Sequence, residues 1–310
     1  MKVGKKVQRL YGVFILLSLI WGSSFFFIKI LLAHYAPASI AFLRCFFGLV
    51  TITIIMLVLR KPFHLRQIPW KPMVMVGLLQ TAVPWYLLGY SETRITSSMA
   101  SVLNATTPFW TTMIGFWWFH KQIHRNQWIG LFLGVCGIFI LLDFHPKQFI
   151  TVDFIGVLLM LATTFCYGYS SQVSKRDLGE LSIYQTVWGT MFVGCLSSGI
   201  IALCFEPFTF APLLKQPNVI FSFVMLGSMG SAVGFLLFFY MVQKGSAEFS
   251  TMVTYLVPAT AILWGFLLLD EPIRWTLLAG LCLILIGVFL SERKPKEANE
   301  MVELEEKSNV

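Results

Sequence analysis

Long runs of apolar residues, separated by short polar stretches, repeat along the whole chain. Many of these runs reach about eighteen residues, which is enough for an α-helix to cross a bilayer core of roughly 30 Å. Backbone groups inside lipid must pair within the protein, so spanning segments are expected to be helical. The pattern predicts ten spanning helices, over residues 11–33, 37–59, 72–91, 96–119, 127–142, 154–174, 182–204, 219–242, 246–269 and 275–290.

Two parts of this pattern resemble each other. Segments 101–140 and 251–290 align without a gap, so that Pro108 pairs with Pro258. Glycines recur in the same register, as Gly115 with Gly265, Gly130 with Gly280 and Gly137 with Gly287. Proline and glycine matches arise less often by chance than Leu or Phe matches, so we infer an internal duplication. The first repeat is expected over residues 1–145 and the second over 150–291, followed by a disordered cytoplasmic tail over 292–310.

The distribution of basic residues indicates how the helices are oriented. One set of alternate loops, with both chain ends, holds most of the lysines and arginines, and the other set holds only Arg94, Lys147, Lys215 and Arg274. Basic loops remain in the cytoplasm, so both termini are expected there. Two five-helix repeats then have opposite orientations, because five is odd. The sequence thus predicts an all-α integral membrane protein with two inverted repeats, an arrangement typical of secondary transporters.

Composition supports this class and excludes others. The 310 residues are 57% hydrophobic and 12% charged, whereas soluble domains average about 45–50% and about 25%. The net charge of +8 does not indicate nucleic-acid binding, because the basic residues lie in short loops between apolar runs. The six cysteines lack metal-ligand spacing and are expected to be buried free thiols. The first apolar run is too long for a signal-peptide core, so a retained span is expected.

Candidate substrate contacts surround the two matched prolines. Pro108 and Pro258 lie near the middle of their spans, where proline kinks a helix and frees the carbonyl four residues earlier. Matched kinks at membrane depth favour a cavity between the repeats, which would suit a small, partly hydrophobic molecule. The expected substrate contacts are Trp21, Ser24, Tyr86, Asn104, Thr107, Tyr167, Ser171, Thr254 and Tyr255. Ordinary helix packing is the alternative for each of them, because small hydroxyl residues are common at membrane-helix interfaces.

Two charged residues, Lys29 and Arg44, lie clearly within predicted spans. Lys29 is near enough to a span end to reach the interface, whereas Arg44 lies roughly 10 Å of helix inside its span and is expected to face the interior. There it would pair with Glu92, with helix-end carbonyls or with a substrate carboxylate. Central Asp, Glu or His residues are missing from the spans, and Glu92 and Glu248 at span ends are the nearest candidates. We therefore expect facilitated movement or weak proton coupling, without a cofactor or metal.

Four stretches carry more specific motifs: IWGSSFFFIK at 20–29, FLRCFFG at 42–48, YLVPATAILWGFLLLDEP at 255–272 and GLCLILIGVFL at 280–290. Together they resemble the EamA family of the drug/metabolite transporter superfamily, over nearly the whole chain. The resemblance implies ten helices in two inverted repeats, a central cavity and export of amino acids or related metabolites by alternating access. The family's helix-2 arginine falls on Arg44. Its acidic residue after the proline-bearing helix falls on Glu271, where the first repeat has Lys121, and the candidate gate residues are Glu92 and Glu271.

A small-molecule exporter in the cytoplasmic membrane, rocking one repeat against the other, is the leading interpretation. A multidrug or nucleotide-type metabolite transporter is the nearest alternative, followed by a non-transporting membrane protein such as a lipid scramblase. An enzyme is not expected, because the sequence lacks Gly-x-Ser-x-Gly, His-Glu-x-x-His and phosphate-binding Gly-x-x-x-x-Gly-Lys-Ser motifs. The sequence leaves the substrate, the coupling ion and the oligomeric state open.

Overall fold

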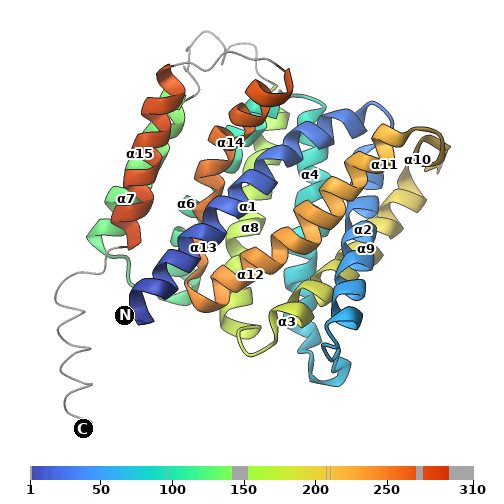
Figure 1. Cartoon of the computed structure of the whole chain (residues 1–310), viewed down its shortest axis with the longest axis horizontal. Coiled ribbons are helices and arrows are strands. Elements are labelled where there is room, and N and C mark those ends of the chain that lie inside the picture. The colour runs from blue at the N-terminus through green and yellow to red at the C-terminus, as the bar shows by residue number, and fades with distance from the viewer. Residues whose placement is uncertain are drawn as a thin grey trace.

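The computed structural model describes residues 2–95, 97–141, 153–206, 208–209, 211–269 and 275–292, and this part of the chain is helical without strands (Figure 1). Its α-helices are α1 (Lys2–Leu32), α2 (Pro37–Val58), α3 (Trp70–Gly77), α4 (Val83–Glu92), α5 (Ser97–Asn104), α6 (Thr107–Phe119), α7 (Arg125–Leu141), α8 (Phe154–Asp177), α9 (Ile183–Phe205), α10 (Ala211–Lys215), α11 (Pro217–Phe223), α12 (Gly234–Lys244), α13 (Ala247–Thr251), α14 (Val253–Leu269) and α15 (Trp275–Glu292). The 3₁₀-helix η1 (Leu65–Gln67) and the π-helices η2 (Leu78–Ala82) and η4 (Val224–Val233) complete the helical segments.

Six helices of the described chain are long and apolar enough to cross a membrane: Gln8–Leu32, Pro37–Val58, Trp70–Glu92, Phe154–Asp177, Ile183–Phe205 and Pro217–Lys244. Their outer faces carry large exposed apolar side chains, such as Leu57 (62% exposed), Leu196 (59%) and Leu203 (65%). Soluble proteins rarely expose apolar patches on this scale. The chain is therefore a membrane protein. The other four predicted spans coincide with the shorter or interrupted helices α5–α6, α7, α13–α14 and α15.

Both helices that carry the matched prolines are interrupted, but in different ways. The first ends at Asn104 and resumes at Thr107, so that Pro108 lies in the first turn of α6. Proline provides no backbone N–H to the Asn104 carbonyl, which instead accepts a hydrogen bond from the Thr107 hydroxyl at 2.6 Å. The second is interrupted at Met252, and Pro258 lies inside α14. The two prolines are thus matched in sequence without having the same local structure.

Two π-helical segments lie at corresponding positions of the sequence repeat. η2 falls in the third predicted span and η4 in the eighth. The residues 150 positions after those of η2 lie within η4. In η4 the Ser231 hydroxyl donates to the Leu226 carbonyl, five residues earlier, at 3.0 Å. π-turns inside helices are frequent at functional sites. Gln80 of η2 and Ser231 of η4 are both buried inside the bundle.

Helices from the two sequence repeats pack against each other across the bundle. α2 lies along α9, α7 along α15, α1 against α14, and α8 against α6 (Figure 1). At the α7–α15 contact, a Cβ on Gly287 would lie 2.8 Å from the Gly130 carbonyl oxygen, and one on Gly137 would lie 2.9 Å from the Gly280 oxygen. Since the contact pairs run in opposite directions along the two helices, α7 and α15 are antiparallel.

Candidate functional site

A cavity lies inside the bundle, where the two interrupted helices meet α1 and α8. Its lining is mainly apolar and aromatic with a few polar side chains, as is usual for small-molecule sites. The predicted substrate contacts that line it are Trp21, Ser24, Asn104, Thr107, Tyr167, Ser171 and Thr254. They come from α1, from both sides of the α5–α6 interruption, from α8 and from α14. The interruption places Asn104 and Thr107 at consecutive helix ends beside the cavity.

Tyr86 and Tyr255, which were also predicted to contact the substrate, do not line this cavity. Tyr255 is fully buried but faces α7, where a Cβ on Gly134 would lie 2.8 Å from its ring. Tyr86 stacks on Tyr90, with ring centroids 6.2 Å apart. Successive helical residues point about 100° apart, so a cavity-facing Thr254 turns its neighbour Tyr255 away.

The prolines shape the cavity through the backbone. Neither Pro108 nor Pro258 lines it, whereas the preceding residues, Thr107 and Val257, do. Pro108 ends the regular hydrogen-bonding of the helix before it, and this sets the direction in which Thr107 points. The cavity is therefore bordered by the helices that carry the prolines and not by the proline rings.

An aromatic wall on one side of the cavity includes two residues that the sequence did not single out. Phe235 and Phe238 of α12 both line the cavity. Trp21 packs on them with centroid distances of 5.8 Å and 5.4 Å, and Trp85 lies 5.8 Å from Phe235. Their three-residue spacing places the two phenylalanines on one helix face, which was the available signal. With 29 phenylalanines in the chain, that signal is weak.

Arg44 of α2 lies at the cavity and is only 6% exposed. Its guanidinium carbon is 3.8 Å from the centroid of the Trp85 ring, and its Nε–H donates to Ser231 Oγ at 2.9 Å. The ion pairs in the described part of the chain are Arg94–Asp153, Lys121–Glu248 and Arg176–Asp177. Arg44 is thus buried in the bundle, where its guanidinium contacts a hydroxyl and a ring face and no carboxylate among the described residues.

The other predicted charged residues lie away from the cavity. Lys29 is exposed, and its Nζ lies 3.4 Å from the Glu92 backbone oxygen. Glu92 is buried at the end of α4; its Oε2 accepts from Ser97 Oγ at 2.9 Å, and its Oε1 has no hydrogen-bond partner among the described residues. Glu271 lies outside the described residues. Within those residues, no group of three or more His, Cys, Asp or Glu side chains is placed to hold a metal ion.

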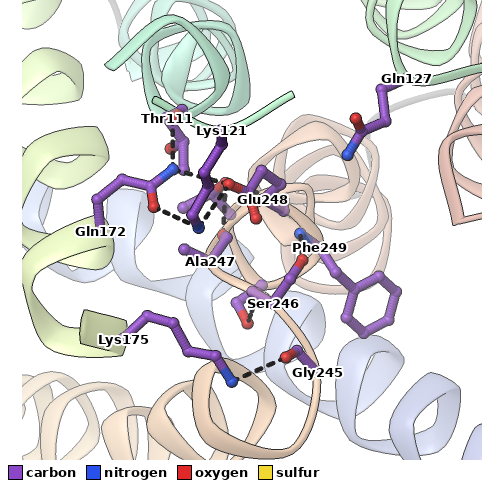
Figure 2. Close-up of polar contacts among 12 residues, drawn as sticks. Thr111, Lys121, Gln127, Gln172, Lys175, Gly245, Ser246, Ala247, Glu248 and Phe249 are labelled. Atoms are coloured by element: carbon purple, nitrogen blue, oxygen red, sulfur yellow. Dashed lines mark hydrogen bonds and ion pairs between the residues drawn. The ribbon is translucent and has the colours of Figure 1, made fainter. Parts of the chain in front are cut away.

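A polar network joins three helical segments at the end of the bundle where the chain begins (Figure 2). Lys121 Nζ lies 3.1 Å from Glu248 Oε1 and 2.7 Å from Gln172 Oε1. Gln172 Nε2 donates to Glu248 Oε1 at 2.8 Å and to the Thr111 carbonyl at 2.7 Å. A Cβ on Gly115 would lie 2.6 Å from Gln172 Nε2, so glycine leaves room for the network. The network links α6 of the first sequence repeat to α8 and α13 of the second.

Polar contacts also join the sequence repeats at the opposite end of the bundle. Arg94 Nη1 lies 2.7 Å from Asp153 Oδ2, while Asp153 Oδ1 caps α8 by accepting from the Ile155 and Gly156 amides at 2.8 Å and 3.1 Å. The hydrogen bond from Arg94, with help from these amides, lowers the pKa of Asp153 from its ordinary value of 3.8. The Glu206 carboxylate similarly accepts from the backbone amides at the start of α2.

The sequence model of the EamA-like transporter family matches the chain twice, over residues 9–143 and 154–293. This chain belongs to the EamA-like transporter family. The prediction drawn from the motifs around Arg44 and Pro258 is thereby confirmed. Membership also supports a small-molecule substrate and a lipid environment, because the family consists of membrane transporters.

Similar proteins within this group are described as transporters. The uncharacterized transporter YoaV of Bacillus subtilis is 25% identical over 289 residues, which cover 92% of this chain and 97% of that protein. The uncharacterized inner membrane transporter YedA of Escherichia coli K12 is 23% identical over 305 residues, covering 94% and 95%. A crystal structure with 15% identity superposes with a TM-score of 0.74 over 92% of this chain and 97% of the other. That likeness shows a shared fold.

Proposed function

We propose that this EamA-type protein is a secondary transporter that exports small metabolites, with amino acids or related compounds as the first candidates. It would act by alternating access in the cytoplasmic membrane, with both termini in the cytoplasm. The observation that carries the proposal is the cavity, which is lined by matched, interrupted helices of the two sequence repeats. Transporter sites are commonly formed by discontinuous helices at the interface between repeats.

An inverted repeat, with five spanning helices in each half, is part of this proposal. The glycine contacts between α7 and α15 support it, because Gly130 meets Gly287 while their repeat counterparts, Gly280 and Gly137, meet each other. A two-fold axis produces this reciprocal pattern, in which residue i contacts j and the counterpart of i contacts the counterpart of j. The antiparallel crossing of these two counterpart helices supports an axis in the membrane plane.

Alternating access requires contacts between the halves at each end to break in turn. The Lys121–Glu248 network joins the halves at the end expected to face the cytoplasm. The Arg94–Asp153 ion pair joins them at the other end. We expect the first set to open when the cavity faces the cytoplasm and the second when it faces outside. Rocking of one half against the other would exchange the two sets.

Uptake by proteoliposomes tests this function. Purified full-length protein is reconstituted and assayed with a labelled amino-acid panel, with and without an imposed pH gradient. Protein that carries Asn104→Ala and Pro258→Ala serves as the comparison. Saturable uptake that the double variant loses would support the proposal, and a weak effect of the gradient is expected. If folded protein takes up no panel member, the amino-acid assignment is wrong, and the assay continues with amphipathic drugs, nucleotide-type metabolites and lipid scrambling.

A further inference from the structure

The guanidinium of Arg44 has donors that the protein does not use. A guanidinium carries five N–H donors. Within the described part of the chain, its Nε–H donates to Ser231 and the two terminal nitrogens have no hydrogen bond. The face of the Trp85 ring offsets part of the cost of burying the Arg44 charge, but the ring does not neutralise that charge. An intramembrane cation in this state is suited to an anionic partner.

Arg44 and Ser24 both line the cavity, and both lie beside Gly230. A Cβ on Gly230 would be 3.2 Å from Ser24 Oγ and 3.9 Å from Arg44 Nη2, so both polar atoms lie beside the same bare stretch of backbone. The Gly230 carbonyl accepts from Trp21 Nε1 at 2.9 Å, which fixes this backbone in place. Ser24 Oγ is buried and has no hydrogen-bond partner among the described residues. A hydroxyl and a guanidinium are therefore available together at the cavity wall.

The charge of the cavity restricts the kind of anion. Among the residues known to line it, Arg44 is the only charged one. A monocarboxylate would be neutralised by this single cation, whereas a phosphate dianion would leave a negative charge buried in an apolar site. The two oxygens of a carboxylate can also accept parallel hydrogen bonds from the two terminal nitrogens of one guanidinium, as in bidentate arginine–carboxylate pairs.

We propose that the cavity selects compounds with a single carboxylate, and that Arg44 binds this carboxylate through its terminal nitrogens, assisted by Ser24. The proposal rests on the transport function proposed above, because it takes the cavity as the substrate site. The remainder of the compound meets the aromatic wall of Phe235 and Phe238. Arg44 is thus the residue that determines specificity, and the aromatic wall tolerates different apolar groups.

Equilibrium binding to purified full-length protein in detergent tests the assignment. The probe is labelled L-phenylalanine, displaced by three analogues: 3-phenylpropionate, L-phenylalaninamide and phenethylamine. We expect the acid to compete at least about tenfold better than the amide or the amine, the usual effect of losing a hydrogen bond to a charged group. Arg44→Gln should abolish this discrimination, and Arg44→Lys should keep part of it because an ammonium provides charge without the fork. Arg66→Gln, on the exposed η1, is the charge-matched control and should leave discrimination unchanged.

The possible results distinguish failure of the Arg44 assignment from failure of the transport function. Equal competition by the acid and the amide in the wild-type protein would overturn the role of Arg44 while leaving transport intact. Retained discrimination in Arg44→Gln would overturn it as well. If the Gln variant does not fold, the wild-type analogue series and the Lys variant decide the matter. Failure of folded wild-type protein to bind phenylalanine or any of the three analogues, and to take up any amino acid, would remove the proposed function together with this assignment.

Discussion

Lys121 and Glu248 are 127 residues apart in the chain, yet their Nζ and Oε1 atoms lie 3.1 Å apart. Glu248 is nearly buried and Gln172 holds both partners, so this contact fixes α6, α8 and α13 relative to one another. The neighbouring Phe249 packs on Tyr11 and Phe14 of α1. A single polar cluster thus ties these helices together at one end of the bundle.

Breaking this cluster should loosen the end of the bundle. Lys121→Gln leaves the nearly buried Glu248 carboxylate without its counter-charge, which costs about 1–3 kcal/mol. Glu248→Gln leaves the Lys121 ammonium, whose side chain is 40% exposed, and should cost less because solvent screens it. We expect lower melting temperatures and faster hydrogen exchange in the peptide that contains α13. The charge-reversed pair, Lys121→Glu with Glu248→Lys, is the internal control and should recover part of the loss. Unchanged exchange in both single variants would show that the cluster does not hold α13.

Gly115 offers a test of the same cluster without removing a charge. An added Cβ in Gly115→Ala would lie 2.6 Å from Gln172 Nε2 and 3.3 Å from Glu248 Oε1, so the amide has to move and its hydrogen bonds weaken. Gly12→Ala is the matched control, because nothing lies within 4 Å of its Cβ. Alanine favours helices over glycine, so this control should be neutral or slightly stabilising. Equal effects of the two substitutions on melting temperature would contradict the packing described at Gly115.

The α7–α15 contact should be intolerant of side chains. In Gly287→Ala the Cβ would lie 2.8 Å from the Gly130 oxygen and 3.1 Å from the Gly134 nitrogen, and backbone cannot give way as a flexible side chain can. We expect a loss of about 1–3 kcal/mol, the usual cost of overpacking. Thermal unfolding in detergent measures it against Gly12→Ala. A melting temperature equal to that of the wild type would mean that the two helices separate easily.

Acidification should weaken the opposite end of the bundle. The pKa of Asp153 is lowered, so its stabilising effect is present above its ordinary value of 3.8 and is lost as the pH falls through the lowered folded value. Melting temperatures measured from about pH 6 down to about pH 3 should therefore fall. Asp153→Asn, which can still cap α8, should show a smaller fall. Parallel curves for the two proteins would rule out a contribution from this carboxylate.

Asn104 should distinguish compounds with an amino group. Its Oδ1 is buried at the cavity without a hydrogen-bond partner among the described residues, so it can accept from a substrate ammonium. Asn104→Ala should weaken phenylalanine binding by about tenfold, while binding of 3-phenylpropionate changes little. Competition binding with the two ligands provides the comparison. Equal weakening of both would assign Asn104 a general packing role.

Much of the fold could be predicted because lipid imposes strong rules. Long apolar runs had to be helices, and the motifs around Arg44 and Pro258 indicated the family. The local structure around the prolines could not be predicted in the same way. Pro108 begins α6, whereas Pro258 lies inside α14 beyond an interruption at Met252. Neither η2 nor η4 contains a proline, and nothing else in their two sequences predicts a π-helical turn.

The site could be predicted only in part, because the apolar pattern does not mark the inner face of a membrane helix. Lipid and protein interior are equally apolar, so hydrophobicity does not say whether Thr254 or Tyr255 faces the cavity. Polar side chains were the usable signal, and Ser24, Asn104 and Ser171 line the cavity. Phe235 and Phe238 gave no such signal, since apolar residues surround them on all sides of their helix.

The π-helical segments place extra residues in the turns of two spanning helices. Each π-turn holds more residues than an α-turn of the same helix, because its hydrogen bonds span five residues instead of four. If one residue of the π-segment adopted α-helical hydrogen bonding, the helix on the far side of the π-segment would rotate by roughly 100° about its axis. In η4 this screw motion would carry Ser231 away from Arg44 while the backbone ladder remains paired. The helix could then exchange the side chains it presents to the cavity by turning about its own axis, with no need to bend or unfold.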